Sequence, residues 1–314
     1  MIDNETLRVA RTIADARDLV SGWRERRLSI GLVPTMGSLH AGHLALIDRA
    51  RAQNDRVLAT LFVNPLQFGP AEDFAGYPRD NARDFGVLRE RRCDAVFAPT
   101  VREMFPDASG SLEDAWTRVT VGPLANVLCG ISRPGHFDGV ATIVLRLLLI
   151  ALPDRAYFGE KDYQQLTLIR RLVRDLNVPV RIEGVPTVRE PDGLALSSRN
   201  AYLNPAQRAI APGLQRVLTA VRDRLAAPGI DAAAETAAGQ AALLAAGFDR
   251  VDYLTLAAGD TLQSLTRPDP AARLFAAAWL GRTRLIDNIP VAKNSSPRAD
   301  EEGESEEAVL FAPV

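Results

Sequence analysis

Residues 29–53 read SIGLVPTMGSLHAGHLALIDRARAQ. The opening SIGLVP is a short apolar run that ends at a proline, which is typical of a buried strand. The turn TMGSLHAGH follows, and beyond it Leu44, Ile47 and Ala50 recur at helical spacing, so a helix begins near Gly42. The stretch therefore predicts a strand, a glycine-containing loop and a helix, in that order.

The same alternation extends along the first 188 residues. The further predicted elements are helices at 13–27, 80–92, 140–152 and 163–176 and strands at 57–64, 94–99, 156–158 and within 180–188. Strands that alternate with helices indicate a parallel sheet covered by helices on both faces. We therefore expect an α/β protein with a Rossmann-like sheet.

The pattern changes after Val188. Two Ala-rich helices are expected at 205–227 and 231–246. Three strands are then expected in VDYLTLA, RLFAAAWL and TRLIDNIPV, and they should be antiparallel because the connections between them are short. We expect a Rossmann-like ligand-binding domain at 1–187, a smaller α+β domain at 188–290 and a disordered acidic tail at 291–314.

Composition indicates a soluble globular enzyme. The chain has 314 residues, of which 47% are hydrophobic and 24% charged, which excludes a disordered or fibrous protein. Two distant cysteines, Cys93 and Cys129, are too few for a disulfide framework, so a reducing cytoplasm is expected. The apolar run 140–152 contains Arg146 and is shorter than the roughly 20 residues that span a bilayer, and the N-terminus lacks the apolar core of a secretory signal.

Charge distribution favours small anionic ligands. The formal net charge is −2, but the tail from 291 carries an excess of acids, so the body is slightly positive and lacks the broad basic surface that nucleic acid requires. Among 37 basic residues only Lys161 and Lys293 are lysine. A GC-rich genome is the alternative explanation for this excess of arginine, but a lysine kept within such a body indicates a place where a compact ammonium is needed.

The first loop predicts a phosphate site. The sequence has neither a Walker P-loop nor a G-x-G-x-x-G after the first strand. Residues 36–43 instead combine glycines, the N-terminus of a helix and the imidazoles of His40 and His43. Two alternatives remain for the histidines. They could form a capping pair, although histidine is not a favoured N-cap residue. They could bind a metal, although no third ligand lies at a spacing that is familiar from zinc sites.

Two further stretches are expected to face the same crevice. GEKD, residues 159–162, lies between a predicted strand and a helix, and ligands of open parallel sheets bind beyond the carboxyl ends of the strands. LSSR, residues 196–199, lies where the two domains meet and offers hydroxyls and a guanidinium to phosphate oxygens. The alternative for GEKD is a solvated turn whose charges only cap the helix. The alternative for LSSR is a surface loop without a binding role.

Two glutamines are candidates for binding a small hydroxy acid. Gln67 follows the second strand and Gln165 lies one turn into the helix after GEKD, and amides bind both hydroxyl and carboxylate oxygens without adding charge. Solvated or helix-packing glutamines are the alternative. RPGHFDGV adds Arg133 and His136, whose role the sequence leaves open.

These motifs together resemble the pantoate–beta-alanine ligases, also called pantothenate synthetases, of the His-x-Gly-His nucleotidyltransferase superfamily. The resemblance runs in order through PTMGSLHAGH, FVNPLQFG, YPRD, RPGHFDGVATIV, YFGEKDYQQL and LALSSRN, and covers residues 1–290. It implies ATP-dependent condensation of (R)-pantoate with beta-alanine through an enzyme-bound pantoyl adenylate, with release of diphosphate and AMP. It also implies a homodimer, with no nucleic-acid or membrane partner.

The resemblance assigns roles to individual residues. Domain 1–187 would bind nucleotide and pantoate, and domain 188–290 would be a lid. His43 would be a proton donor and His40 would lie on the phosphates; Gln67 and Gln165 would hold pantoate, and Gln67 would also lie near beta-alanine. We expect catalysis to depend on His40, His43, Lys161, Ser197, Ser198 and Arg199. The implied ATP site comprises Met36, Gly37, Ser38, Leu39, His40, Ala41, Gly42, His43, Gly159, Glu160, Lys161, Asp162, Val188, Leu196, Ser197, Ser198 and Arg199.

Two points qualify this assignment. Mg²⁺ is expected to accompany ATP, with Asp162 as a candidate ligand, although this ion keeps several waters and binds mainly to the phosphates. Leu196 stands where the family usually has methionine, a volume-conserving change that a site tolerates.

Three other functions compete with this interpretation. A different nucleotidyltransferase of the superfamily would share His-x-Gly-His but not the combination of FVNPLQFG, RPGHFDG and GEKD. A fragment of an aminoacyl-tRNA synthetase fits poorly with the near-neutral body and small second domain. A catalytically silent nucleotide-binding module would not release diphosphate in response to pantoate.

Overall fold

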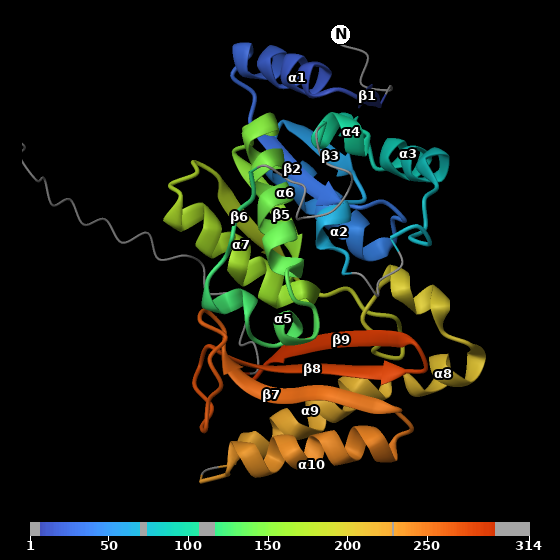
Figure 1. The fold of residues 1–314 in the computed structure, drawn as a ribbon, viewed down its shortest axis with the longest axis vertical. Helices are drawn as coiled ribbons and strands as arrows, with labels where there is room; N and C mark the ends of the chain where they lie inside the picture. Colours follow the sequence, from blue (N-terminus) through green and yellow to red (C-terminus); the bar gives the residue numbers. More distant parts are fainter. Residues whose placement is uncertain (1–6, 70–73, 107–116, 228, 293–314) are drawn as a thin grey trace, which may run out of the picture.

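A six-stranded parallel sheet forms the centre of the computed structural model, which describes residues 7–69, 74–106, 117–227 and 229–292 (Figure 1). Its strand order is β1-β4-β3-β2-β5-β6. The strands are β1 (Arg8–Ala10), β2 (Ile30–Thr35), β3 (Arg56–Leu61), β4 (Ala95–Phe97), β5 (Arg155–Gly159) and β6 (Arg181–Val185). The predicted Rossmann-like sheet is thus confirmed.

Alternating side chains bury both faces of this sheet. In β2, Ile30 and Leu32 point into one apolar core, whereas Val33 points into another on the opposite face. The first core includes side chains of α1 (Ile13–Glu25), α6 (His136–Ala151) and α7 (Tyr163–Asp175), and the second includes those of α2 (Ala41–Gln53) and α3 (Asn81–Glu90). Burial on both faces explains why the strands are continuously apolar in sequence.

A second sheet with its own core follows. It is antiparallel, in the order β7 (Arg250–Ala258), β8 (Ala272–Leu280) and β9 (Thr283–Pro290), and α9 (Gly213–Leu225) and α10 (Ala232–Ala245) pack on one face (Figure 1). Its other face contacts the first part of the chain through Tyr253, Phe275 and Ile286. The predicted smaller α+β part is confirmed; a domain boundary at 187/188 stays a proposal, which the change of sheet type supports.

Some predicted elements differ from the observed ones. The strand β1 was not predicted, because three residues are too few to show a period. Helix α6 begins at His136 rather than at 140, after Gly135 in the left-handed conformation. The predicted helix 205–227 is interrupted near Pro212, which separates α8 (Pro205–Ile210) from α9.

Short helical turns complete the fold. They are α4 (Val101–Met104), α5 (Cys129–Ser132) and the 3₁₀ helices η1 (Pro65–Gln67), η2 (Pro123–Ala125), η3 (Glu160–Asp162) and η4 (Ser198–Tyr202). None of the helices in the described part of the chain is both long and apolar enough to cross a membrane. The tail predicted to be disordered lies outside the described residues, apart from its first two positions.

Gly139 allows α6 to approach η1 closely, and its substitution tests this packing. A Cβ on Gly139 would lie 2.1 Å from the carbonyl oxygen of Leu66. We expect Gly139→Ala to lower the free energy of unfolding by about 1–3 kcal/mol, because one of the two backbones must move. Gly22→Ala in α1 is the matched control, since nothing lies within 4 Å of the added methyl, and alanine there should raise stability by up to ~1 kcal/mol. Urea unfolding of both variants measures the difference.

Candidate functional site

The three sequence stretches converge on one cavity of about 230 Å³ at the carboxyl ends of β2, β3, β5 and β6. This is the edge of the sheet at which an open α/β protein binds its ligands. The predicted site residues that line it are Met36, His40, Gly42, His43, Gln67, Gly159, Lys161, Asp162, Gln165, Val188, Leu196, Ser197, Ser198 and Arg199, together with Arg133 and His136.

Five predicted ATP-site residues do not line this cavity. They are Gly37, Ser38, Leu39, Ala41 and Glu160. Leu39 points into the core and is 2% exposed, whereas Ala41 is exposed at the start of α2. Gly37 and Ser38 both have left-handed φ angles, of 86° and 53°, so they shape the loop backbone.

Asp84 of α3 holds this left-handed loop, a role that was not predicted from the sequence. Its carboxylate is fully buried and accepts hydrogen bonds from the backbone N–H of Ser38 at 2.8 Å and of Leu39 at 2.9 Å. A buried carboxylate with two backbone donors fixes the conformation of the segment that it binds. One sequence signal was present, since Asp84 lies one helical turn before the buried Leu88 and thus on the inner face of α3.

His40 and His43 form a capping box at the start of α2. His40 Nδ1 accepts from the N–H of Gly42 at 3.1 Å, and the N–H of His40 donates to His43 Nδ1 at 3.4 Å. The alternative of a capping pair, which was not favoured from the sequence, is therefore confirmed for these Nδ1 atoms. Because each Nδ1 accepts, a neutral ring carries its proton on Nε2, where it can donate to a ligand.

Burial keeps both imidazoles neutral. It lowers the pKa of His40 to about 4, helped by the Lys161 ammonium. It lowers the pKa of His43 to about 3, helped by His40. The pair therefore presents N–H donors rather than positive charge at neutral pH in the absence of a ligand.

Gln67 is fixed by a polar cluster. Its amide oxygen accepts from Asn64 Nδ2 at 3.1 Å, and its Nε2 lies 3.0 Å from the sulfur of Met36. Asn64 is 1% exposed and also donates to the carbonyl of Gly139 at 3.1 Å. Asn64 belongs to the FVNPLQFG stretch, but its role was not predicted from the sequence.

Arg133 and His136 hold the backbone of Gln67. His136 Nδ1 lies 2.8 Å from the carbonyl oxygen of Gln67, and Arg133 Nη2 donates to the same oxygen at 3.3 Å. Arg133 Nη1 lies 2.9 Å from His136 Nε2. This arrangement gives the RPGHFDGV motif a structural function, which the sequence alone had not supplied.

Charged groups of the second and third stretches meet in the cavity. Lys161 Nζ lies 3.8 Å from Asp162 Oδ1, and the Lys161 side chain is 17% exposed. Enclosure in the site raises the pKa of Asp162, but Lys161 and Arg199 outweigh it, so that the pKa falls below its ordinary value. Asp162 is thus an ionised carboxylate with cations beside it. Among the described residues, no three His, Cys, Asp or Glu side chains gather in a way that could hold a metal ion.

A larger cleft of about 1120 Å³ adjoins this cavity between the two sheets. Lys161, Ser197 and Arg199 line both spaces, whereas Trp279 and Arg284 of the second sheet line only the cleft. The site is therefore open toward the second sheet.

A family model describes nearly the whole chain. Residues 8–290 match the model for pantoate-beta-alanine ligase. The chain belongs to the pantoate-beta-alanine ligase family. The match includes all the stretches that line the cavity and confirms the resemblance seen in the sequence.

Close relatives support the assignment to the pantoate-beta-alanine ligase family. A pantothenate synthetase from Paramagnetospirillum magneticum is 53% identical over 283 residues, which cover 90% of this chain and 97% of that protein. The crystal structure of a pantothenate synthetase from Thermus thermophilus is 50% identical, with a TM-score of 0.84 over 91% of this chain and 100% of that one. A pantoate-beta-alanine ligase from Francisella tularensis, crystallised with beta-gamma ATP and beta-alanine, is 34% identical, with a TM-score of 0.77 over 93% and 100% of the two chains.

The low pKa values of the two imidazoles predict a pH-dependent stability. The unfolded chain takes up protons at these histidines near pH 6.5, but the folded chain does so only near 4 and 3, so acid favours unfolding. We expect the free energy of unfolding to fall below about pH 6.5, by on the order of 1 kcal/mol per pH unit for each histidine. Urea unfolding between pH 7 and 5 measures this loss.

The control is the double variant His40→Asn, His43→Gln, which keeps capping-box side chains but removes both imidazoles. Its stability should depend less on pH in the same interval. NMR signals of His40 and His43 that titrate near pH 6.5 in the ligand-free protein would contradict the prediction.

Proposed function

We propose that the chain joins (R)-pantoate to beta-alanine in two steps, through a pantoyl adenylate, with ATP as the second substrate of the first step. The observation that carries this proposal is the convergence of residues 36–43, 159–162 and 196–199 on one cavity, beside Gln67 and Gln165. Membership of the pantoate-beta-alanine ligase family and the ligands of the Francisella tularensis structure support it. The product, pantothenate, is a precursor of coenzyme A.

In the first step a carboxylate oxygen of pantoate attacks the α-phosphorus of ATP. The bond from that phosphorus to the bridging oxygen breaks, and diphosphate leaves with its negative charge. Catalysis then consists of positioning the reactants and stabilising phosphate oxygens. Lys161 and Arg199 provide permanent cations, and the backbone N–H groups at the start of α2 provide dipoles.

His40 and His43 contribute as neutral donors. Their Nδ1 atoms serve the capping box, so their Nε2–H groups are available to phosphate oxygens. When the triphosphate binds, its negative charge raises the pKa of both rings and strengthens these hydrogen bonds. Ser197 and Ser198 add hydroxyl donors from another wall of the cavity.

Mg²⁺ fits this site as a companion of ATP. Asp162 offers an ionised carboxylate that is half exposed at the cavity, and a single carboxylate suits an ion that retains waters and binds phosphates. When bound, the ion would neutralise phosphate charge. Asp162 would hold it, and Lys161 and Arg199 would still contact the remaining oxygens.

The two glutamines form the acid-binding end of the site. Gln67 is held rigidly by Asn64, Arg133 and His136, and Gln165 projects from the first turn of α7. Amide groups bind the hydroxyls of pantoate without neutralising the carboxylate that must attack. Gln67 would also lie beside beta-alanine in the second step.

In the second step the amine of beta-alanine attacks the carbonyl carbon of the anhydride. AMP leaves, the amine loses a proton, and the amide of pantothenate forms. The anhydride must be kept from water until then. We propose that residues 188–290 act as a lid over the adjoining cleft, because the second sheet lines that cleft and Ser197 and Arg199 line it as well.

Removing the ammonium tests the first step. We expect Lys161→Ala to lower pantoate-dependent diphosphate release by at least about 100-fold, because a preorganised charge at the phosphates is lost. Circular dichroism should show an unchanged fold, since the side chain packs in no core cluster. Near-normal diphosphate release by this variant would remove Lys161 from the mechanism.

Gln67→Ala is the matched control within the same cavity. It should raise the KM for pantoate more than the KM for ATP, because the amide lies at the proposed acid-binding end of the cavity. If the variant lost only its affinity for ATP, Gln67 would not belong to the pantoate-binding part of the cavity. Release of diphosphate without pantoate would contradict the proposed function itself.

We propose a homodimer that works in the cytoplasm. Both cysteines are free and buried, as suits a reducing compartment. Large apolar side chains are exposed at the carboxyl ends of the adjacent helices α6 and α7, namely Leu149, Leu152 and Leu176. Light scattering should give a mass in solution of twice that of the monomer. Leu149→Lys should reduce this mass toward that of the monomer, because it places a charge on the exposed apolar surface. A wild-type protein that is monomeric would contradict the proposal.

A further inference from the structure

Asn288 on β9 contacts the backbone of the GEKD turn. Its side chain is buried, with 3% of the residue exposed, and Nδ2 donates to the carbonyl oxygens of Glu160 at 2.8 Å and Lys161 at 2.9 Å. Asn288 lies 127 residues after Lys161 in the chain, on the second sheet. A side chain of one sheet thus fixes the turn that ends a strand of the other.

Arg273 of β8 fixes the amide of Asn288. Its Nε and Nη2 donate to Asn288 Oδ1 at 2.9 and 2.7 Å. Because a guanidinium only donates and a carbonyl only accepts, these partners allow a single orientation of the amide. Arg273 also lies 3.5 Å from the Glu160 carboxylate and 3.9 Å above the ring of Tyr163, so it is tied to the same turn.

The turn depends on these contacts from outside. Lys161 lies in the short 3₁₀ helix η3, and no side chain caps the start of that helix. Three-residue 3₁₀ segments have weaker internal hydrogen bonds than α-helices. The two hydrogen bonds from Asn288 therefore hold the backbone from which the Lys161 side chain extends.

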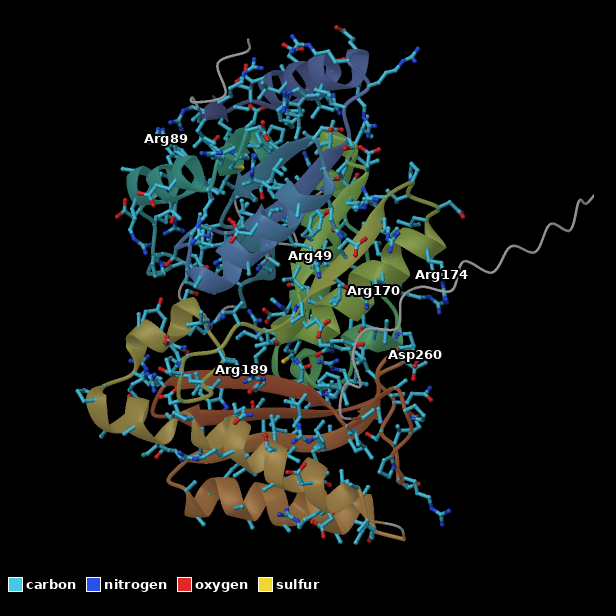
Figure 2. The ribbon with its side chains drawn as sticks, turned by 180° about the vertical axis from the view of Figure 1, so that it is seen from behind. Arg49, Arg89, Arg170, Arg174, Arg189 and Asp260 are labelled. Atoms are coloured by element: carbon cyan, nitrogen blue, oxygen red, sulfur yellow. The ribbon has the colours of Figure 1, made fainter. Side chains whose placement is uncertain are left out.

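The neighbouring residue Asp287 holds a second wall of the ATP site. Its carboxylate accepts two hydrogen bonds from Arg189, at 2.6 and 2.9 Å, and Arg189 lies at the seam between the sheets (Figure 2). Arg189 also donates to the carbonyl of Gly193, within the turn that leads to residues 196–199. Since successive strand residues point to opposite faces, β9 holds both segments at once.

We infer that Asn288 is a positioning residue for adenylation, which acts by fixing the backbone of Lys161. The inference rests on the proposed role of Lys161 in the first step. Asn288 lines the larger cleft but not the smaller cavity, and its amide oxygen and nitrogen are both engaged, by Arg273 and by the turn, so it acts through the turn. A displacement of about 1 Å in a reacting group can cost on the order of 100-fold in rate.

Asn288→Asp tests this inference. The carboxylate keeps the shape of the side chain and the contacts with Arg273, but it loses both donors to the carbonyl groups. We expect pantoate-dependent diphosphate formation in a single turnover to slow by about 10- to 100-fold, with an unchanged KM for beta-alanine. A rate within twofold of that of the wild-type protein would overturn the inference. The proposed function would still stand in that case, because it is tested by pantoate-dependent diphosphate formation in the wild-type protein.

The matched control is Asn54→Asp, at the opposite edge of the first sheet. Asn54 Nδ2 also makes two hydrogen bonds, to the carbonyl of Ala50 at 2.8 Å and to the hydroxyl of Tyr157 at 2.7 Å. This variant should lose thermal stability, because it also replaces an amide that donates two hydrogen bonds, but it should keep its rate of diphosphate formation. Equal slowing of both variants would assign the effect to general destabilisation and overturn the inference.

A double-mutant cycle with Lys161→Ala separates positioning from other effects. If Asn288 acts through Lys161, Asn288→Asp should change the rate less than about twofold once Lys161 is absent. Independent, multiplicative losses would overturn the inference. If Asn288→Asp does not fold, Arg273→Lys is the second variant, because it keeps the positive charge but loses the paired contact with Asn288. We expect it to slow the same step by about tenfold. An unchanged rate would overturn the inference.

Discussion

The parallel pairing of β2 with β3 on one side and β5 on the other brings the site together. Parallel strands end at the same edge of a sheet, so the loops that follow these strands must share one volume. That volume receives the capped start of α2, the η1 turn with Gln67 and the η3 turn with Lys161. Residues far apart in the chain thereby become neighbours around a single cavity.

Elements with a strong period were predictable from the sequence, whereas long-range polar contacts were not. The strands at 30–35 and 56–61 and the helices α2 and α7 follow directly from apolar spacing. Asp84 and Asn288 did not stand out, because each acts on a backbone far away in the chain and neither belongs to a local motif. The partner of a buried polar side chain depends on the fold, so only coordinates reveal it.

The chemistry of the first loop was predicted only in part. The sequence predicted a phosphate-binding loop with two imidazoles, but it did not show their protonation state or the atoms that each ring would leave available. Burial makes both rings neutral, and their Nδ1 atoms are already engaged in the capping box. An uncharged, preorganised loop costs less to bury than two unpaired cations would before the ligand arrives. The cationic side chains that line the cavity are instead those of Arg133, Lys161 and Arg199.

The scarcity of lysine gains a chemical meaning from the acyl anhydride proposed as the intermediate. Such an anhydride acylates accessible amines, and a surface rich in lysine would compete with the amine substrate. Lys161 is the only lysine of the described residues, and Lys293 is the only other in the sequence. Arginine, whose delocalised guanidinium stays protonated, occupies the remaining basic positions. With so few lysine amines, the polypeptide would be a poor target for this proposed intermediate.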